Sequence, residues 1–362
     1  LIVAIMTKKV AVAILNWNGK KWLEQFLPNV ITHSESIAEI VMIDNGSTDD
    51  SISFCQLNFP QVTIIALEKN HGFAGGYNKG LKQLNHPYFV LLNSDIEVSQ
   101  DWLISPIEWL ESDHKLVACQ PKILNYHKRN EFEYAGACGG FMDQDGYAFC
   151  KGRIFFSFEN DEGQYTGREE VFWATGAALI IKSSAWKEVN GLDADFFAHM
   201  EEIDLCWRLK NRGYKIGTDL NSSVFHVGGG TLDRLNPNKT FLNFRNNLIL
   251  LSKNYHQSSL FLKIVKRMIL DGVAGVRFLT EGKWHHFTAI LRAHFAFYVM
   301  LPSTLQKRRT ESNNIKDPNL TGWYQSSILY AFFIQGKKEF HQLNTHFFVP
   351  TAQVRNELDL EK

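Results

Sequence analysis

The sequence predicts an α/β protein with a mostly parallel sheet flanked by helices, followed by a helical C-terminal part. Three observations lead to this prediction. Short apolar runs alternate with helical patterns over the first 120 residues, several of these runs end in polar side chains, and the pattern turns helical and rich in Phe after about residue 240. At 362 residues and 45% hydrophobic content, the chain can bury a large core.

The first part of the chain contains four expected strands. Each is a continuous run rich in Val, Ile and Leu, which is typical of strands buried on both faces. The strands are expected at residues 10–15, 40–43, 62–67 and 88–92, and helices at about 21–33, 49–58, 74–84 and 101–112. Alternation at this spacing indicates βαβ units with right-handed crossovers.

The pattern changes over residues 116–240. Gly and aromatic residues become frequent, and residues 143–146 have the composition of a hairpin turn. A strand pair is expected around residues 171–181, helices at 184–190 and 200–211, and a further strand at 222–226. We therefore expect one domain over residues 1–240, with halves at about 8–115 and 116–240, and a mainly helical extension over 241–362.

Charge and cysteine content exclude several protein classes. Lys+Arg and Asp+Glu both number 38, which gives no support for nucleic acid as a partner. The five cysteines are scattered, without a CxxC pair, so neither a disulfide framework nor a zinc ribbon is expected and a reducing cytoplasm fits. Residues 1–9 lack the features of a signal peptide, and Met6 fits a natural start. No run of 18 uncharged apolar residues predicts a spanning helix.

Polar residues follow each of the four strands. Because ligands of open α/β sheets bind outside the carboxyl ends of the strands, these residues describe one pocket. They are Asn16, Asp44, Asn45, Asn70, Gly72, Asn78, Asn93 and Asp95. Asp95 is our first choice as ligand of a hard divalent cation that neutralises a nucleotide diphosphate leaving group, while Asp44 and Asn16 suit hydrogen bonds to base and ribose.

Each of these features also has a simpler interpretation. Residues 44–47 could form only a turn before a helix, with Ser47 or Thr48 as N-cap. The glycines at 72, 75 and 76 could serve tight packing instead of an approach to phosphate. Asp95 could merely cap the next helix. We favour the pocket because the features occur together.

A second group of polar residues begins the helix expected at 200–211. Glu201, Glu202 and Asp204 occupy its first turn, where the helix dipole favours negative charge, and Asp204 can pair with Arg208. A solvated helix start would look the same. The functional interpretation is that one carboxylate takes the proton from an acceptor hydroxyl.

His226 ends the last expected strand. A lone histidine there is usually structural, but this one is followed by three glycines and Thr231. It therefore fits a contact to diphosphate or a place in a metal shell.

In these residues the chain resembles the family 2 glycosyltransferases, which have a GT-A fold, and among them the rhamnosyltransferase-like bacterial enzymes of surface-polysaccharide assembly. The resemblance covers about residues 9–232. The matching stretches, in family order, are VAVAILNWNG, VMIDNGSTDDS, NHGFAGGYNKGL, VLLNSDIEV, WATGAALIIK, FFAHMEEIDLCWRLKNRGYKI and SVFHVGGGTL.

The resemblance implies a role for each matching residue. Asn16, Asp44 and Asn45 would line the nucleoside site, completed by Asn70, Gly72 and Asn78. Asn93-Ser94-Asp95 would stand for the family's DxD motif, with Asp95 as its metal carboxylate, Asn in place of the first Asp and His226 as a further metal or diphosphate contact. The catalytic base would be Glu202, with Glu201 second and Asp204 beside them, and Trp173, Thr175 and Gly176 would border the acceptor.

The implied activity is an inverting glycosyl transfer that needs Mg²⁺ or Mn²⁺. The donor would be a nucleotide-diphosphate sugar (dTDP-rhamnose or a UDP-sugar), and the acceptor a glycan or lipid-linked hydroxyl, in the cytoplasm. Two alternatives differ in class. A nucleotidyltransferase should carry a Gly-rich basic loop after the first strand, where this chain has Asn-Trp-Asn-Gly. A binding scaffold without catalysis need not retain Asp95, Glu202 and His226.

The C-terminal third has two open interpretations. Residues 258–310 combine apolar patches with Lys and Arg. They could form a basic amphipathic surface in the interface of the inner membrane face, near lipid-linked acceptors. They could equally be ordinary helices packed on the catalytic domain, because one face of either would look the same.

Overall fold

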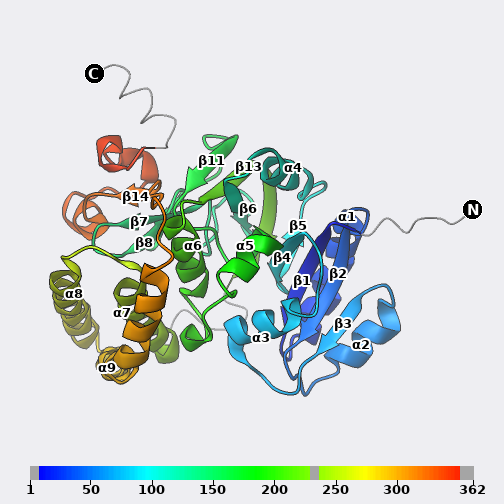
Figure 1. Ribbon diagram of the computed structural model, residues 1–362, viewed down its shortest axis with the longest axis horizontal. Helices are drawn as coiled ribbons and strands as arrows, with labels where there is room; N and C mark the ends of the chain where they lie inside the picture. The colour runs from blue at the N-terminus through cyan, green and yellow to red at the C-terminus, as the bar shows by residue number, and fades with distance from the viewer. Residues whose placement is uncertain (1–7, 229–235, 351–362) are drawn as a thin grey trace, which may run out of the picture.

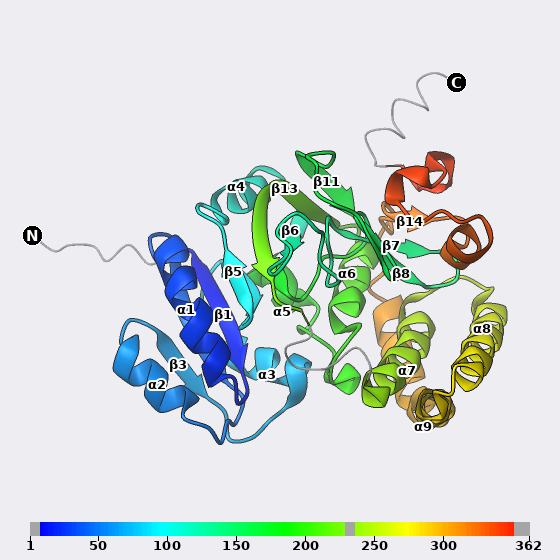
Figure 2. The ribbon, with the colours of Figure 1, turned by 180° about the vertical axis from the view of Figure 1, so that it is seen from behind.

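The structure is a computed structural model that describes residues 8–228 and 236–350. A large sheet crosses the molecule, with the N-terminal strand-helix units at one end and helices α7 to α9 at the other (Figure 1). Figure 2 shows the same arrangement from behind. The expectations for residues 1–7 lie outside the described residues.

The first four strands form the parallel part of the main sheet and confirm the predicted βαβ units. In sheet order they are β3 (Thr63–Ala66), β2 (Ala38–Asp44), β1 (Val10–Asn16) and β4 (Tyr88–Asn93). The accompanying helices are α1 (Lys20–Ser34), α2 (Ser51–Asn58), α3 (Gly72–Leu81) and α4 (Ile104–Ser112).

Strand β1 shows why its sequence is apolar without interruption. Val12 and Ile14 join one hydrophobic cluster with residues of α1, whereas Ala11 and Ala13 join a second cluster with residues of α3. Successive side chains of a strand point to opposite faces, so a strand covered on both sides needs apolar residues throughout. Helix α3 can lie close to the sheet because Gly80 has no side chain. A Cβ at this position would stand 2.3 Å from the side chain of Ile43.

Beyond β4 the sheet is mixed. The strands continue as β12 (Ala178–Lys182), β6 (Leu116–Asn125), β13 (Lys215–His226) and β11 (Arg168–Val171), with β5 (Ile96–Val98) paired to β13. The expected strand pair at 171–181 is wrong, because β11 pairs with β13 and β12 lies between β4 and β6. Two neighbouring apolar runs cannot indicate which partners each will find.

A second, smaller sheet packs beside the first. Its order is β10 (Ser157–Phe158), β9 (Arg153–Ile154), β8 (Ala148–Cys150), β7 (Gly140–Asp143) and β14 (Trp323–Tyr324). The turn predicted at 143–146 is confirmed between β7 and β8, with Gly146 at a φ of +80°. Helices α5 (Ser183–Glu188) and α6 (Glu201–Asn211) follow in the chain.

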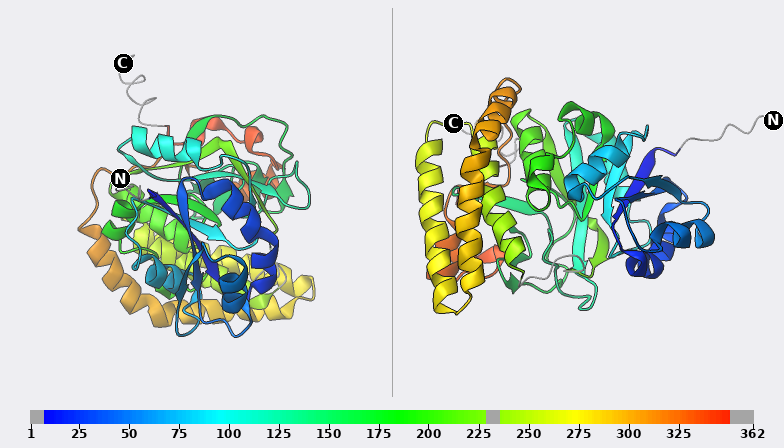
Figure 3. Two further views of the ribbon diagram at one scale, coloured as in Figure 1. Left: turned by 90° about the vertical axis from the view of Figure 1, so that its right-hand side faces the viewer. Right: turned by 90° about the horizontal axis from the view of Figure 1, so that it is seen from below.

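The C-terminal part begins with three helices, as expected. They are α7 (Pro237–Asn254), α8 (Leu260–Thr280) and α9 (Trp284–Ser312). Seen from below, α8 and α9 run side by side along the outer edge, with α7 between them and the rest of the molecule (Figure 3). The chain then returns to the second sheet as β14, and its described part ends with a π-helix (Tyr330–Ile334) and short 3₁₀ turns (Phe340–Gln342 and Thr345–Phe347). None of the helices within the described ranges has the length and apolar character needed to cross a membrane.

The five cysteine side chains lie in the interior. All five are buried and free, so they act as small apolar residues of the core.

Helices α6 and α7 are joined by a buried carboxylate. One oxygen of Asp204 accepts hydrogen bonds from Arg208 Nε (2.7 Å) and Lys253 Nζ (2.9 Å), and the other accepts one from Asn254 Nδ2 (2.7 Å). Burial acts to raise the pKa of Asp204, but the charges of Arg208 and Lys253 outweigh it and lower this pKa. Asp204 is therefore an ionised carboxylate with its partners in place.

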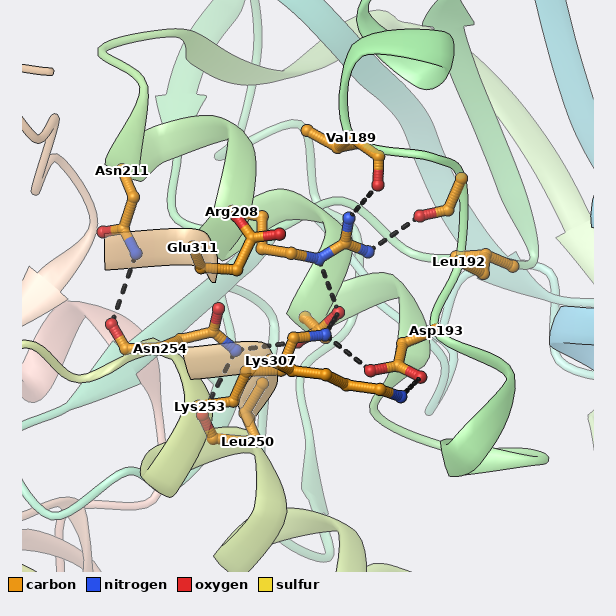
Figure 4. A network of polar contacts seen from close by, with 12 residues as sticks. Val189, Leu192, Asp193, Arg208, Asn211, Leu250, Lys253, Asn254, Lys307 and Glu311 are labelled. Carbon is orange, nitrogen blue, oxygen red and sulfur yellow. Dashed lines mark hydrogen bonds and ion pairs between the residues drawn. The ribbon is translucent and has the colours of Figure 1, made fainter. Parts of the chain in front are cut away.

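The same network reaches α9. Lys253 Nζ also lies 2.6 Å from Asp193, whose other oxygen is 2.5 Å from Nζ of Lys307 (Figure 4). Lysines from α7 and α9 thus meet on one carboxylate in the loop before α6. The network fixes the C-terminal helices against the helix that carries Glu201 and Glu202.

The network makes Lys253→Met a strongly destabilising change. Removing this ammonium leaves two buried carboxylates short of a partner, which should lower the free energy of unfolding by about 3 kcal/mol. Chemical denaturation would measure it. The matched control is Lys283→Met, whose exposed pair with Glu281 spans 2.7 Å and should cost less than about 1 kcal/mol. Equal losses in the two variants would contradict a structural role for the network.

Candidate active site

The ends of β1 and β2 supply the first polar wall of the site. Asn16 Nδ2 donates to Asp44 Oδ1 (3.0 Å) and to Ser47 Oγ (3.1 Å), and the other oxygen of Asp44 accepts from the Ser47 amide (2.9 Å). The N-cap position of α2 is Asp50 and not Ser47 or Thr48, so Ser47 belongs to this wall. Asn16 Oδ1 is buried and has no hydrogen-bond partner among the described residues, which leaves an acceptor for a ligand.

The neighbouring asparagines hold the wall in place. Asn45 Nδ2 donates to Asn70 Oδ1 and to the carbonyl of Gly72, both at 3.0 Å, and Asn45 Oδ1 accepts from the His71 amide (3.0 Å). Asn78 uses both atoms of its amide on the backbone of Leu192, at 2.7 and 2.9 Å. These residues were expected to touch the nucleotide. The amides of Asn45 and Asn78 are instead bonded to other parts of the protein, so these two residues stabilise the loops of the wall.

The glycines after β3 support the packing interpretation. A Cβ at Gly76 would lie 2.7 Å from Leu15 and 3.0 Å from Asn45 Nδ2. Gly72 has a φ of +71°, and a Cβ there would meet the ring of Phe197 at 2.8 Å. The glycines therefore let α3 and the 197 loop approach the strand ends.

Asp95 and His226 meet because β5 pairs with the end of β13. His226 is the register partner of Ile96, and the Val227 amide donates to the Asp95 carbonyl (3.1 Å). His226 Nε2 then lies 3.2 Å from Asp95 Oδ1 and 3.4 Å from Asn93 Nδ2. The two residues expected at a metal are thus brought together, and Gly229, Gly230 and Thr231 lie outside the described residues.

Glu133 belongs to this site, although the sequence did not indicate it. Its carboxylate lies 3.0 Å from His226 Nδ1, on the side of the ring opposite Asp95. Burial acts to lower the pKa of His226, but the two carboxylates outweigh it and raise this pKa to about 10. No sequence signal marks Glu133, because 93 residues separate it from His226.

The donor set fits a divalent cation shared with a substrate. Asp95 offers a hard oxygen and His226 an imidazole nitrogen, both suited to Mn²⁺, and a carboxylate behind a ligating histidine is the usual support of such a ring. Within the described ranges no three His, Cys, Asp or Glu side chains are grouped to enclose a metal. Sites with one or two protein ligands take the rest from substrate phosphates.

The second carboxylate group begins α6 from an unusual backbone. Phe197, His199 and Met200 have φ values of 64°, 69° and 74°. Non-glycine residues in this left-handed region cost free energy and cluster at functional sites. Their conformation turns the chain sharply into the first turn of α6, where Glu201 and Glu202 stand.

Asn246 of α7 holds the loop before α6, and the sequence did not indicate this role either. Its buried Nδ2 lies within 3.0 Å of the carbonyl oxygens of Phe196, Ala198 and His199. Arg245 beside it donates to the carbonyl of Phe196 (3.0 Å). A helix from the C-terminal part therefore supports the backbone that presents the two glutamates.

Glu201 and Glu202 are carboxylates short of partners. One oxygen of each is buried without a hydrogen bond among the described residues. Burial raises the pKa of Glu202 from its ordinary 4.5 to about 7, and burial together with the charge of Glu202 raises the pKa of Glu201 well above its usual value. Asp204 differs, because its oxygens are engaged by Arg208, Lys253 and Asn254. The predicted Asp204–Arg208 pair is confirmed, and it removes Asp204 from the candidates for proton transfer.

The two carboxylate groups stand at the same edge of the sheet. A Cβ at Gly176 would lie 3.5 Å from Glu202 Cβ, and the next residue, Ala177, accepts a hydrogen bond from the Asn93 amide (2.9 Å). Asn93 ends β4, two residues before Asp95. One short backbone segment thus links Glu202 to Asn93, which stands two residues before Asp95 in the chain.

The expected acceptor residues differ in their surroundings. Trp173 is a core side chain whose Nε1 donates to the Phe141 carbonyl (3.0 Å). Thr175 is buried, and its hydroxyl accepts from the Ala177 amide (3.2 Å). Gly176 lies next to Glu202, since a Cβ at Gly176 would stand 3.5 Å from Glu202 Cβ.

Comparisons with known proteins show what this chain is similar to. Residues 11–186 match the model of the family described as glycosyl transferase family 2. The chain is 23% identical over 290 residues to the low-salt glycan biosynthesis hexosyltransferase Agl10 of Haloferax volcanii, covering 77% of this chain and 87% of that protein. It is 27% identical over 208 residues to poly-beta-1,6-N-acetyl-D-glucosamine synthase of Staphylococcus aureus, over 55% of this chain and less than half (45%) of that protein.

A solved structure shares the fold. The mannosyltransferase PcManGT from Pyrobaculum calidifontis, in complex with GDP-Man and Mn²⁺, superposes with a TM-score of 0.52 at 12% identity, covering 80% of this chain and 87% of that chain. The mixed α/β sheet described above is accordingly the expected GT-A fold.

The raised pKa of Glu202 predicts a pH-dependent gain in stability on Glu202→Gln. A carboxyl with a raised folded-state pKa contributes stability below its unfolded pKa of 4.5, and that contribution is lost as the pH rises through about 7. At pH 8 the glutamine variant should therefore be more stable by about 2–3 kcal/mol, and at pH 4 it should show no gain. Thermal unfolding at both pH values measures this. The control, Glu162→Gln at an exposed position, should change little; a variant that is not stabilised at pH 8 would contradict the burial effect.

Proposed function

We propose that this chain, which carries a glycosyltransferase domain of family 2, is a metal-dependent inverting glycosyltransferase. It moves a sugar from a nucleotide-diphosphate-sugar donor to a hydroxyl of a glycan or lipid-linked acceptor in bacterial cell-surface polysaccharide synthesis. The observation that carries the proposal is the Gly176–Ala177 segment, where Gly176 lies against Glu202 and the Ala177 carbonyl accepts a hydrogen bond from the Asn93 amide. The Asn93 side chain lies 3.4 Å from Nε2 of His226, which is paired with Asp95.

The donor site in this proposal is the wall formed by β1 and β2. Asn16 and Asp44 face the nucleoside, because Asn16 Oδ1 is an acceptor without a partner among the described residues and Asp44 lies beside it. Asn45, Asn70, Gly72 and Asn78 keep the wall in shape. The donors we would test first are dTDP-rhamnose and UDP-sugars, on the family resemblance of the motifs.

Asp95 and His226 would hold a Mg²⁺ or Mn²⁺ ion, with Asn93 beside them. When bound, this cation supplies a Lewis acid that neutralises charge on the departing diphosphate. Glu133 orients the imidazole through its Nδ1 atom. PcManGT, a protein of the same fold, is in complex with Mn²⁺ in its own structure.

Glu202 is the base in this proposal. It takes the proton of the acceptor hydroxyl while that oxygen bonds to the anomeric carbon and the bond from this carbon to the diphosphate breaks. A single displacement of this kind inverts the anomeric centre. Glu202 is preferred over Glu201 because it is less buried, lies beside Gly176, and has a pKa of about 7, near the pH at which a base works best.

The place of action that we propose is the cytoplasm, at the inner face of the cell membrane when the acceptor is lipid-linked. The cytoplasm supplies nucleotide sugars. It is also a reducing environment, which suits five free cysteines.

Glu202→Gln should separate donor binding from turnover. Donor affinity, measured by calorimetry, should stay within about twofold, while kcat should fall by about a hundredfold or more because the acceptor proton has no base. The rate of the native chain should rise with pH through about 7, where Glu202 loses its proton, and the variant should lose this dependence. Glu162→Gln is the control. Native turnover in Glu202→Gln would contradict the assignment.

Asp95→Asn should weaken donor binding only when metal is present. Calorimetric titration of the donor with and without Mn²⁺ should show a loss of about tenfold or more in the metal-dependent affinity, since an amide replaces a carboxylate ligand. Glu133→Gln should cause a loss of about tenfold by releasing the His226 ring. The exposed Asp101, at a φ of 58° that asparagine tolerates, offers Asp101→Asn as control. Equal metal dependence in all variants would overturn the site.

A further inference from the structure

Helices α8 and α9 expose an unusual amount of apolar surface. Thirteen of the 22 large apolar side chains exposed in the described ranges lie on these two helices. On α8 they are Phe261, Leu262, Val265, Ile269, Val273, Val276 and Leu279, and on α9 they are Trp284, Leu291, Phe295, Tyr298, Val299 and Leu305. We call these thirteen residues the apolar face.

The apolar face points away from the protein. Along α8, Val265, Ile269, Val273 and Val276 recur every three or four residues, which places them on one side of the helix. Ile269 and Val273 are 62% and 63% exposed. On α9, Leu291, Phe295 and Tyr298 follow the same spacing. Figure 3 shows the two helices side by side at the outer edge of the molecule.

Two polar residues of α8, Arg267 and Asp271, point inward. Asp271 is fully buried, with one oxygen 2.8 Å from Arg267 Nε and the other 3.1 Å from His294 Nε2 of α9. The Arg267 guanidinium lies 3.8 Å from the centre of the Tyr147 ring. A surface helix of a water-soluble protein has the opposite polarity. Helix α8 is therefore arranged for an apolar medium on its outer side.

Basic residues border the apolar face. Residues 260–310 contain nine lysines and arginines against two acidic residues, in a chain whose total charge is zero. One of those two acidic residues, Asp271, is buried, and the other, Glu281, is bonded to Arg277 and Lys283. Lys266 pairs with Asp145, and Lys307 pairs with Asp193 and Asp195, so the remaining excess of positive charge comes from Lys263, Arg292, Arg308 and Arg309. An apolar surface with this excess matches an anionic lipid headgroup layer.

A groove on this surface lies between α7 and α9. It has a volume of about 470 Å³ and is lined by Phe241 of α7 and by Leu291, Arg292, Phe295 and Ala296 of α9. Arg245, one turn further along α7, lies 5.4 Å from the Phe241 ring and donates to the Phe196 carbonyl. The groove is therefore one residue removed from the loop that presents Glu201 and Glu202.

We propose that the apolar face lies in the interface of an anionic lipid bilayer. The helices lie on the membrane without crossing it, with the α7–α9 groove opening at the lipid surface beside the acceptor side of the catalytic edge. The link to a lipid-linked acceptor rests on the proposed function. The membrane contact itself rests only on the residues of the apolar face.

Vesicle flotation with the full chain tests the surface. The native protein should float with vesicles of phosphatidylcholine and phosphatidylglycerol, and less with phosphatidylcholine alone or at high salt. Ile269→Glu with Val273→Glu should reduce binding by about tenfold or more, because two charges enter the apolar layer. Val299→Glu on α9 is an independent second variant. Leu57→Glu, at an 82% exposed position on α2 at the other end of the molecule, is the matched control and should bind like the native chain.

Two further measurements distinguish the outcomes. The α8 variant should retain its melting temperature and its transfer to a soluble acceptor, whereas Glu202→Gln should lose transfer and still float, so the two proposals can fail separately. Absent flotation of the native chain, or native flotation of the α8 and α9 variants, would overturn the surface. It would also be overturned by a native dimer that these variants make monomeric while vesicles stay unbound, since a second copy would then cover the face.

Discussion

The buried carboxylate of Asp204 is the contact on which the rest of the catalytic half depends. It lies three residues after Glu201 on the same helix, and it ties that helix to α7 through Lys253 and Asn254. An ionised carboxylate with its partners can be buried at acceptable cost. Glu201 and Glu202 differ, because one oxygen of each is buried without a hydrogen bond to any residue that the structure describes, and the pKa of each is raised. The satisfied carboxylate thus secures a helix whose first turn is energetically unfavourable. Asn246 adds the second restraint by holding the left-handed loop.

The sequence was sufficient for the parallel half of the fold and for the polar residues at its edge. Strands such as β1 are apolar at every position because both faces are covered, and Asn16, Asp44 and Asn93 stand out at their carboxyl ends. Local patterns could not supply the partners. Glu133 reaches His226 across 93 residues, and Asn246 reaches Phe196 across 50, through pairing and packing that no short window contains. The same limit explains why β11 and β12 were expected to pair with each other.

Residue type was also a weaker guide than residue surroundings. Asp204 shares its helix turn with Glu201 and Glu202, yet only the structure distinguishes a carboxylate with three partners from carboxylates with free oxygens. Asn45 and Asn78 resemble Asn16 in the sequence, but their amides are occupied by backbone groups. For α8, the periodicity of apolar residues was compatible with either orientation. The buried Arg267–Asp271 pair decides it, because it shows which side of the helix faces the protein.

Strand β14 determines where the chain could be shortened to make a fragment that still folds. It pairs with β7, and Trp323 packs on the rings of Phe172 and Trp207, at 5.5 Å from each. Phe172 lies within the matched residues 11–186 and Trp207 lies on α6, so a fragment ended near residue 240 would leave both rings uncovered. It would also lack Lys253 and Lys307, which neutralise Asp204 and Asp193. The region recognisable by family comparison is therefore smaller than the unit able to fold. A minimal autonomous fragment of this protein must include the residues up to Trp323 and Tyr324.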